Sequence, residues 1–236
     1  QQAKGQANKD RFAAAHPELW AAMDAAEAGF LFSLADQVAR NGDLSDKQID
    51  AAERALGPAR RSRLHLFFGT SDLHLAAKHK MEKPEALTTI ERALRMAKGR
   101  FTEIEFSAED ALRTEPAFLK EVLECAAAAG ADVLNVPDTV GYTSPEEIYA
   151  LFADLTANVE RPEHVIFSTH NHNDLGMAVA NSLAAVRGGA RQVECTINGI
   201  GERAGNCALE EVVMALKTRA DHYRADTGIR TQGLYA

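Results

Sequence analysis

The chain has 236 residues, of which 46% are hydrophobic and 25% are charged, and its formal net charge is −8. This length can bury a sizeable core, and the composition is typical of a soluble globular protein. The excess of acidic residues excludes general nucleic-acid binding, which needs a basic surface.

No apolar run is long enough to span a membrane, and the N-terminal stretch QQAKGQANKD lacks the apolar core of a signal peptide. The three cysteines, Cys125, Cys195 and Cys207, have unrelated spacings and form no CxxC motif. Such cysteines are typical of a reducing compartment, so we expect a cytoplasmic protein with no membrane partner.

The first 57 residues show helical patterns only. The stretch FLFSLADQVARNG places apolar residues on one helical stripe and ends with an Asn-Gly pair. A further helix begins with the capping-box sequence SDKQ at Ser45 and ends at a Gly-Pro pair. We therefore predict a short helical segment of unknown role over residues 1–57, followed by a different domain over residues 58–236.

From residue 58 onward, strand and helix patterns alternate. Five apolar runs are predicted strands: 64–69, 102–107, 132–138, 164–170 and 192–198. Ser144 is the predicted N-cap of a helix that begins at Pro145, and Gly130 and Gly188-Gly189 stand where helices should end. Five strands separated by helices predict an α/β fold with a parallel sheet covered by helices.

The number of strands leaves two architectures open. A complete (β/α)₈ barrel needs about 250 residues, at about thirty for each β/α unit. Residues 58–236 supply five such units, and the preceding helical segment is too short for three more. The sheet is therefore either open and doubly wound, or the later part of a barrel whose first strands are absent from this chain.

Two histidines in the stretch STHNHNDLGM are candidate metal ligands. His170 and His172 stand at the end of strand 164–170, and residues i and i+2 of a strand face the same side. Barrels of this class carry their catalytic groups at that end of the strands. Two imidazoles with an oxygen ligand suit Mn²⁺ or Zn²⁺ and, less readily, Mg²⁺. By itself the pair is weak evidence and favours two polar residues at a strand end, but two other strand ends strengthen the case for a metal.

Two other strand ends carry polar groups. Ser107 and Glu109 are expected to lie just past strand 102–107, although the same stretch suits a solvated loop with a helix N-cap. After the last strand, the sequence NGIGERAGN places three glycines around an acidic and a basic residue. This predicts a loop that can approach a ligand closely, and Asn206 at its end offers an amide oxygen. Because a helix follows, backbone N–H groups of the loop could meet an anion.

Four stretches strongly resemble the 2-isopropylmalate synthase family, in the same order. They are LHLFFGTSDLHLAAKHKM, IEFSAEDALRTEPAFL, NVPDTVGYTSPEEI and STHNHNDLGMAVANSLAAVRGGARQVECTINGIGERAGNCALEEVVMALKTR. The resemblance covers residues 58–236 only. It implies a partial TIM (β/α)₈ barrel of about five C-terminal units, with residues 1–57 unrelated to the family.

The resemblance also implies a reaction. Family members condense acetyl-CoA with 2-oxoisovalerate to give 2-isopropylmalate, the committed step of leucine biosynthesis, and they are homodimers. A divalent metal (Mn, Mg or Zn) binds the 2-oxo acid as Lewis acid and template. Homocitrate and citramalate synthases share the metal motif and remain alternatives.

The resemblance assigns roles by motif position. The metal ligands match His170, His172 and Asn206. Residues that contact the 2-oxo acid or line its pocket match Ser107, Glu109, Thr139, His65 and Asn135, with Glu109 in a catalytic position. The loop at the acetyl-CoA side matches Gly199, Gly201, Glu202, Arg203 and Gly205.

One family motif has no counterpart in the sequence. The family's first strand carries Asp-Arg-Asp/Glu-Gly, which supplies a fourth metal ligand and an arginine, whereas the only Asp-Arg pair here, Asp10-Arg11, is followed by Phe12. The family's C-terminal regions are also unmatched. We therefore expect a truncated enzyme that is weak or inactive alone. The alternatives are a non-catalytic chimaeric fragment with an N-terminal helical interaction module, or helices that cover the open barrel edge.

Overall fold

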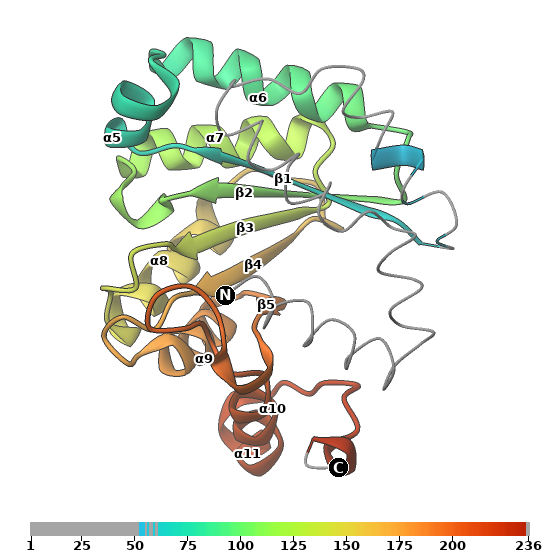
Figure 1. Cartoon of the computed structure of the whole chain (residues 1–236), viewed down its shortest axis with the longest axis vertical. Helices are drawn as coiled ribbons and strands as arrows, with labels where there is room; N and C mark the ends of the chain where they lie inside the picture. The colour runs from blue at the N-terminus through green and yellow to red at the C-terminus, as the bar shows by residue number, and fades with distance from the viewer. Residues whose placement is uncertain (1–51, 55, 57–58, 60, 235–236) are drawn as a thin grey trace, which may run out of the picture.

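A computed structural model describes residues 52–54, 56, 59 and 61–234 of the chain (Figure 1). Five strands form one parallel sheet: β1 (Arg63–Gly69), β2 (Glu103–Glu109), β3 (Val133–Asp138), β4 (Ile166–Asn171) and β5 (Gln192–Glu194). The longer helices are α6 (Lys83–Ala97), α7 (Pro116–Ala129), α8 (Pro145–Asn158), α9 (Ala178–Gly188) and α10 (Leu209–Thr218). The short elements are α5 (Asp72–His74), η1 (Leu75–His79), η2 (Ala111–Arg113), η3 (Ile197–Gly199), α11 (Ala220–Tyr223) and η4 (Thr231–Gly233).

The order of the strands decides between the two predicted architectures. The strands pair in chain order from β1 to β5, and every pairing is parallel. A doubly wound sheet reverses its strand order at a switch point, whereas a barrel adds each strand on the same side of the last. In Figure 1 the helices α6 to α10 succeed one another along the sheet in the same order. The fold is therefore part of an α/β barrel.

Alternation along the strands gives the sheet an apolar face and a polar face. In β2, Ile104, Phe106 and Ala108 are buried in the main hydrophobic core, which also contains residues of α6 and α7. The intervening side chains of Glu105 and Ser107 face the opposite side, because successive strand residues alternate. Helices cover the apolar face, so the candidate site residues lie on the polar one.

The predicted helix boundaries are confirmed. Ser144 is the N-cap of α8 and forms a capping box with Glu147, and Pro145 is the first helical residue. Gly130 ends α7 with a φ of 113°, a left-handed conformation that favours glycine. Gly189 ends α9 in the same way, with a φ of 122°.

The carboxyl-terminal ends of two strands differ from the prediction by two residues or more. Strand β2 continues to Glu109, so Ser107 and Glu109 lie within the strand and not beyond it. Strand β5 ends at Glu194, and the prediction of a strand to residue 198 is wrong. The chain leaves the sheet there because Thr196 pairs with Ala208, and Asn198 adopts a left-handed φ of 57° that begins a turn.

Most of the predicted helical segment 1–57 lies outside the described residues. Residues 52–54 and 56 are helical, and Ala52 is buried in the main core with Leu56 packed against it. The end of that segment therefore packs on the barrel. None of the helices in the described part of the chain is long and apolar enough to cross a membrane.

Candidate functional site

The three predicted metal ligands lie together at the carboxyl end of the sheet. His170 is near the end of β4, and His172, just beyond it, pairs with Asn206 across an isolated bridge. The Nε2 atoms of His170 and His172 are 3.1 Å apart, and Nδ2 of Asn206 lies 3.0 Å from Nε2 of His170. Segments far apart in the sequence thus converge on one point.

The spacing of these atoms fits a shared cation. An octahedral ion with ligands at about 2.1 Å places neighbouring ligand atoms about 3 Å apart, as the two Nε2 atoms are. The third ligand fits less directly, because Oδ1 of Asn206 accepts a hydrogen bond from the Glu202 N–H at 3.0 Å. The amide nitrogen of Asn206, not the expected oxygen, therefore faces His170.

The Nδ1 atoms of the two histidines contact side chains of opposite charge. Nδ1 of His170 lies 2.7 Å from Oε2 of Glu194, and Nδ1 of His172 lies 2.9 Å from Nη2 of Arg203. Burial, followed by the proximity of His170 and Arg203, lowers the pKa of His172, so its ring is neutral at pH 7. A guanidinium can only donate. Nδ1 of His172 therefore accepts, and the ring proton lies on Nε2.

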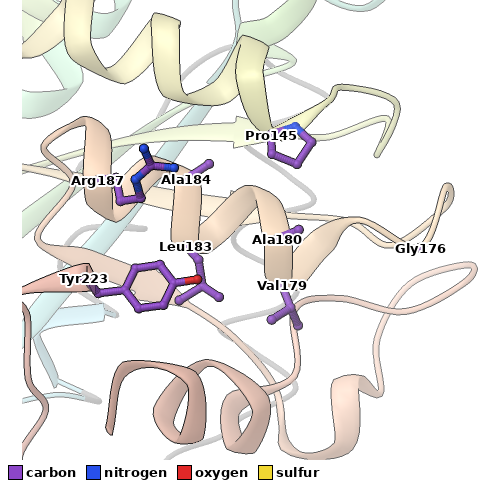
Figure 2. Close-up of a pocket in the computed structure, with 8 residues that line it drawn as sticks. All are labelled: Pro145, Gly176, Val179, Ala180, Leu183, Ala184, Arg187 and Tyr223. Atoms are coloured by element: carbon purple, nitrogen blue, oxygen red, sulfur yellow. The ribbon is translucent and has the colours of Figure 1, made fainter. Parts of the chain in front are cut away.

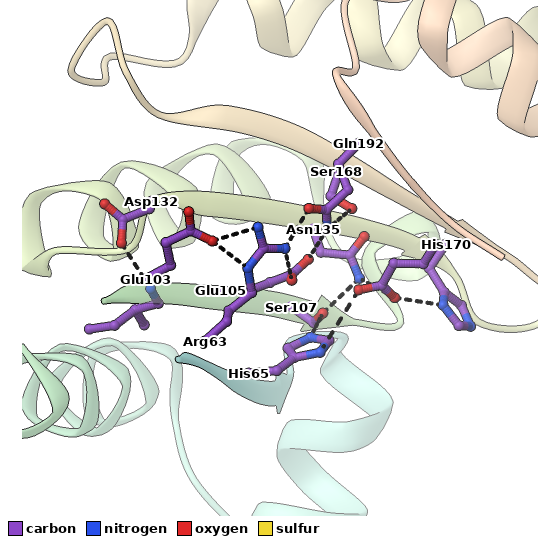
Figure 3. Close-up of polar contacts among 12 residues, drawn as sticks. Arg63, His65, Glu103, Glu105, Ser107, Asp132, Asn135, Ser168, His170 and Gln192 are labelled. Carbon is purple, nitrogen blue, oxygen red and sulfur yellow. Dashed lines mark hydrogen bonds and ion pairs between the residues drawn. The ribbon is translucent and has the colours of Figure 1, made fainter. Parts of the chain in front are cut away.

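A hydrogen-bonded chain on the polar face joins three predicted pocket residues to His170 (Figure 3). Nε2 of His65 lies 2.6 Å from Oγ of Ser107, which accepts from Nδ2 of Asn135 at 2.7 Å. The same Asn135 nitrogen lies 3.3 Å from Oε2 of Glu194, the oxygen that contacts His170. The structure thus brings His65, Ser107 and Asn135 together, with Glu194 as the link.

A second layer of the network was missed by the sequence analysis. Nε2 of Gln192 donates to Oε1 of Glu105 at 2.7 Å and to Oγ of Ser168 at 3.0 Å, and Nη1 of Arg63 donates to Oε2 of Glu105 at 3.1 Å. Burial, then the nearby carboxyl of Glu194, raises the pKa of Glu105 to about 7. Burial is the largest single influence on Glu194 and raises its pKa, but the His170 hydrogen bond together with the nearby His65 and Glu105 outweighs burial, so the pKa of Glu194 is lowered.

A usable signal for this layer was present in the sequence. Glu105 stands two residues before Ser107, and Arg63 two residues before His65, so strand alternation places them on the polar face. Together His65, Glu105 and Glu194 have possible ligand atoms within 4.8 Å of one another. Because Arg63 and Gln192 already donate to Glu105, this group is a hydrogen-bonded network and not a cation site.

The predicted catalytic residue Glu109 ends β2 beside a cation. Nζ of Lys78 lies 2.6 Å from its Oε2, and Nε2 of His74 lies 3.8 Å from its Oε1. Lys78 belongs to η1, a π-helical turn, which is a form often found at functional sites. Neither Lys78 nor His74 is among the predicted site residues.

Thr139 connects Asp110, the residue that follows β2, to the glycine-rich loop. Its Oγ1 accepts from the N–H of Asp110 at 3.0 Å, and its carbonyl oxygen accepts from Nη2 of Arg203 at 2.8 Å. The loop that carries Thr139 is folded around Asp138, which is fully buried. The Asp138 carboxylate accepts from the N–H groups of residues 141, 142 and 143 and from the Thr143 hydroxyl.

The glycine-rich loop 199–205 packs closely against Asn206. A Cβ atom at Gly201 would lie 1.6 Å from Oδ1 of Asn206. Gly199 and Gly205 have φ values of 63° and 107°. Arg203 is also left-handed, at 57°, and its guanidinium forms two 2.8 Å hydrogen bonds with Asp174. Glu202 contributes its N–H to Asn206, so the close approach is to a candidate ligand.

A surface pocket lies on the helical side of the sheet (Figure 2). It is bounded by α8, α9 and α11, and its lining includes Pro145, Val179, Leu183, Arg187 and Tyr223. The guanidinium of Arg187 lies 5.1 Å from the ring centre of Tyr149. None of these residues belongs to the histidine site.

Comparison with known proteins places the geometry in context. The HMGL-like family model matches residues 26–236, which includes part of the segment predicted to have no family counterpart. A 2-isopropylmalate synthase from Xanthomonas campestris pv. campestris (strain B100) is 58% identical over 183 residues, covering 78% of this chain and 35% of that protein. One from Xylella fastidiosa (strain M23) is 55% identical over the same coverage. The chain spans about a third of the length of these relatives.

Solved structures at low identity resemble the fold. HMG-CoA lyase from Pseudomonas aeruginosa matches with a TM-score of 0.65 at 20% identity, covering 81% of this chain and 64% of that one. HMG-CoA lyase from Brucella melitensis matches with a TM-score of 0.65 at 19% identity, covering 80% and 68%. At these identities the likeness concerns the fold alone.

Proposed function

The chain belongs to the HMGL-like family, and we propose that it carries the metal- and substrate-binding strands of a 2-isopropylmalate synthase-type acyltransferase. The reaction is the condensation of acetyl-CoA with 2-oxoisovalerate. Identity of 58% to a 2-isopropylmalate synthase supports this choice. A role in leucine biosynthesis, a cytoplasmic location and a homodimeric assembly are parts of the same proposal.

The observation that carries the proposal is the convergence of His170, His172 and Asn206. At the carboxyl ends of the strands, Nε2 of His170 lies 3.1 Å from Nε2 of His172 and 3.0 Å from Nδ2 of Asn206. These residues would hold a divalent ion of Mn, Mg or Zn, with the Asn206 amide turned to present its oxygen. When bound, the ion polarises the keto and carboxylate oxygens of the 2-oxo acid as a Lewis acid.

The other proposed roles belong to groups on the same rim of the sheet. The Glu109 carboxylate, positioned by Lys78, would accept the proton that leaves the acetyl methyl group. His65, Ser107, Asn135 and Thr139 would line the 2-oxo acid pocket. The N–H groups of loop 199–205 would face the acetyl-CoA side.

The activity of this chain by itself is proposed to be weak or absent. The sequence has no Asp-Arg-Asp/Glu-Gly motif, so the metal has three candidate protein ligands and no family arginine beside it. Water would complete the coordination, and we expect weaker metal binding than in a complete family member. A non-catalytic fragment is the alternative from another class.

Titration calorimetry with Mn²⁺ tests the proposed site. We expect one-to-one binding by the whole chain, lost in His170→Ala and kept in His164→Ala. His164 is a suitable control because it is an exposed histidine beside Asp132, near the opposite end of the same strand. Absence of Mn²⁺ binding by the unmodified chain, or full binding by His170→Ala, would refute the proposed site.

Turnover assays then separate the substrates. The Mn²⁺-loaded chain is given acetyl-CoA with 2-oxoisovalerate, pyruvate or 2-oxoglutarate, and free CoA is measured. Release with 2-oxoisovalerate supports the proposal. Release with pyruvate alone assigns a citramalate synthase, and release with 2-oxoglutarate alone a homocitrate synthase. Metal binding without turnover of any of the three favours the non-catalytic fragment.

A further inference from the structure

Glu194 occupies a position between the candidate metal ligands and the polar network. It is the last residue of β5 and is the register partner of His170 in β4. Oε2 of Glu194 lies 2.7 Å from Nδ1 of His170, on the side of the ring opposite the convergence point at Nε2. No motif in the sequence drew attention to this residue.

The contact fixes which nitrogen of His170 carries the proton. A carboxylate can only accept, so Nδ1 of His170 must donate and keeps its proton. With the ring proton on Nδ1, the lone pair that can bind a metal lies on Nε2, which points at His172 and Asn206. The donors there agree with this assignment, because Nε2 of His172 carries a proton and the amide nitrogen of Asn206 also donates.

We infer that Glu194 is a positioning residue that holds His170 in the Nδ1–H form and thereby prepares its Nε2 to bind the divalent metal. The inference rests on the proposed metal site. Carboxylates behind metal-binding histidines orient the ring and make it a stronger ligand, and their loss typically weakens metal binding about 10- to 100-fold.

Polar hydrogen-bonding groups surround the carboxylate of Glu194. Nδ1 of His170 lies 2.7 Å from it, Nδ2 of Asn135 lies 3.3 Å away and Nδ1 of His65 lies 3.8 Å away. Glu105, the other carboxyl of the network, is 3% exposed and instead accepts from Nη1 of Arg63 and Nε2 of Gln192. Of these two carboxyls, Glu194 is therefore the one that contacts His170.

The same pair offers a matched control. Glu194→Gln and Glu105→Gln each replace one carboxyl of the network with an isosteric amide, but only the first removes the anion behind His170. We expect Glu194→Gln to lower the Mn²⁺ affinity roughly 10- to 100-fold, as the loss of a residue that orients a metal ligand typically does. Glu105→Gln should leave the affinity close to that of the unmodified chain. Equal losses in the two variants would assign Glu194 a general structural role and overturn the inference.

A second measurement works without metal. The ¹⁵N chemical shifts of the imidazoles distinguish the two neutral forms of His170 in the labelled whole chain. We expect the Nδ1–H form in the unmodified chain and in Glu105→Gln, and a shift toward the Nε2–H form in Glu194→Gln. An Nε2–H ring in the unmodified chain would overturn the inference. A chain with the expected shifts that binds no Mn²⁺ would instead refute the proposed function while keeping the role of Glu194.

Discussion

His170 and His172 are the same residue type on the same face of one strand end, yet their surroundings prepare them differently. His170 has the carboxylate of Glu194 behind Nδ1, so its Nε2 has a free lone pair. His172 has the guanidinium of Arg203 there, so its Nε2 carries the proton. The group that contacts Nδ1, and not the His-x-His spacing, therefore decides whether Nε2 of each ring is free to bind a metal.

Several hydrogen bonds hold Arg203 in its contact with Nδ1 of His172. Its guanidinium bonds to both carboxylate oxygens of Asp174 and to the Thr139 carbonyl, besides the ring of His172. Metal binding through Nε2 of His172 requires a proton on Nδ1, where Arg203 now donates. His172 can therefore become a ligand only when Arg203 gives up this contact, while His170 needs no such change.

The largest expected effect comes from removing each ring in turn. We expect His170→Ala to lower the Mn²⁺ affinity by more than about a hundredfold. This loss exceeds the one typical of residues that contact only a metal ligand and not the metal. His172→Ala should cost less, because binding at His172 also breaks the Arg203 hydrogen bond. Calorimetry with Mn²⁺ on both variants measures the two losses. A greater loss of affinity in His172→Ala would show that His172, and not His170, is the better prepared ligand.

The pH dependence of stability should report on Glu105, the buried carboxyl in the network behind His170. The pKa of Glu105 is raised from 4.5 to about 7, so the folded state holds more protons than the unfolded state between these values. Stability then falls as pH rises through this window, by on the order of 2 kcal/mol, because solvent and Glu194 offset part of the burial cost.

Urea unfolding of the unmodified chain and of Glu105→Gln, from pH 5 to pH 8, isolates this contribution. The unfolding free energy of the unmodified chain minus that of Glu105→Gln should fall steadily as pH rises through the window and level off above it. The subtraction is needed because His79, whose pKa is lowered to about 4 by burial, gives the opposite slope below pH 6.5. A difference in unfolding free energy that does not change with pH would show that Glu105 does not hold this proton in the folded state.

Removing Arg203 should make His172 resemble His170. Arg203→Gln leaves Nδ1 of His172 free to carry its proton, and a hydrogen bond to a charged donor contributes about 1.5–3 kcal/mol. We expect Mn²⁺ to bind roughly tenfold more tightly. Arg187→Gln on α9 is the control, since its guanidinium lies over Tyr149 and away from the site. Weaker binding by Arg203→Gln would mean that the arginine supports the metal site.

The smallest expected effect concerns Lys78. Its ion pair with Glu109 is partly exposed, and such pairs contribute about 0–1 kcal/mol. Lys78→Met should therefore change the thermal unfolding midpoint slightly and leave Mn²⁺ affinity unchanged, because its carboxylate partner is not a candidate ligand. A clear fall in affinity would extend the metal site toward β2.

The local features of this protein can be predicted from the amino-acid sequence. Strand alternation, the Ser144 cap and the Gly130 helix end depend on residues within a few positions of one another, so their pattern can be read from the chain. The same holds for His170 and His172, which two-residue spacing places on one face. The α/β class followed from the succession of these elements, and the resemblance to known motifs supplied the candidate roles.

The hydrogen-bond partners of those residues, in contrast, depend on how distant segments fold together. Parallel pairing in chain order selected a partial barrel over a doubly wound sheet, and it set Glu194 beside His170 across β4 and β5. The turn of loop 199–205 brought Arg203 to His172. The position of a ring proton depends on which donors and acceptors lie within about 3 Å. These come from distant segments, and no local pattern encodes their approach.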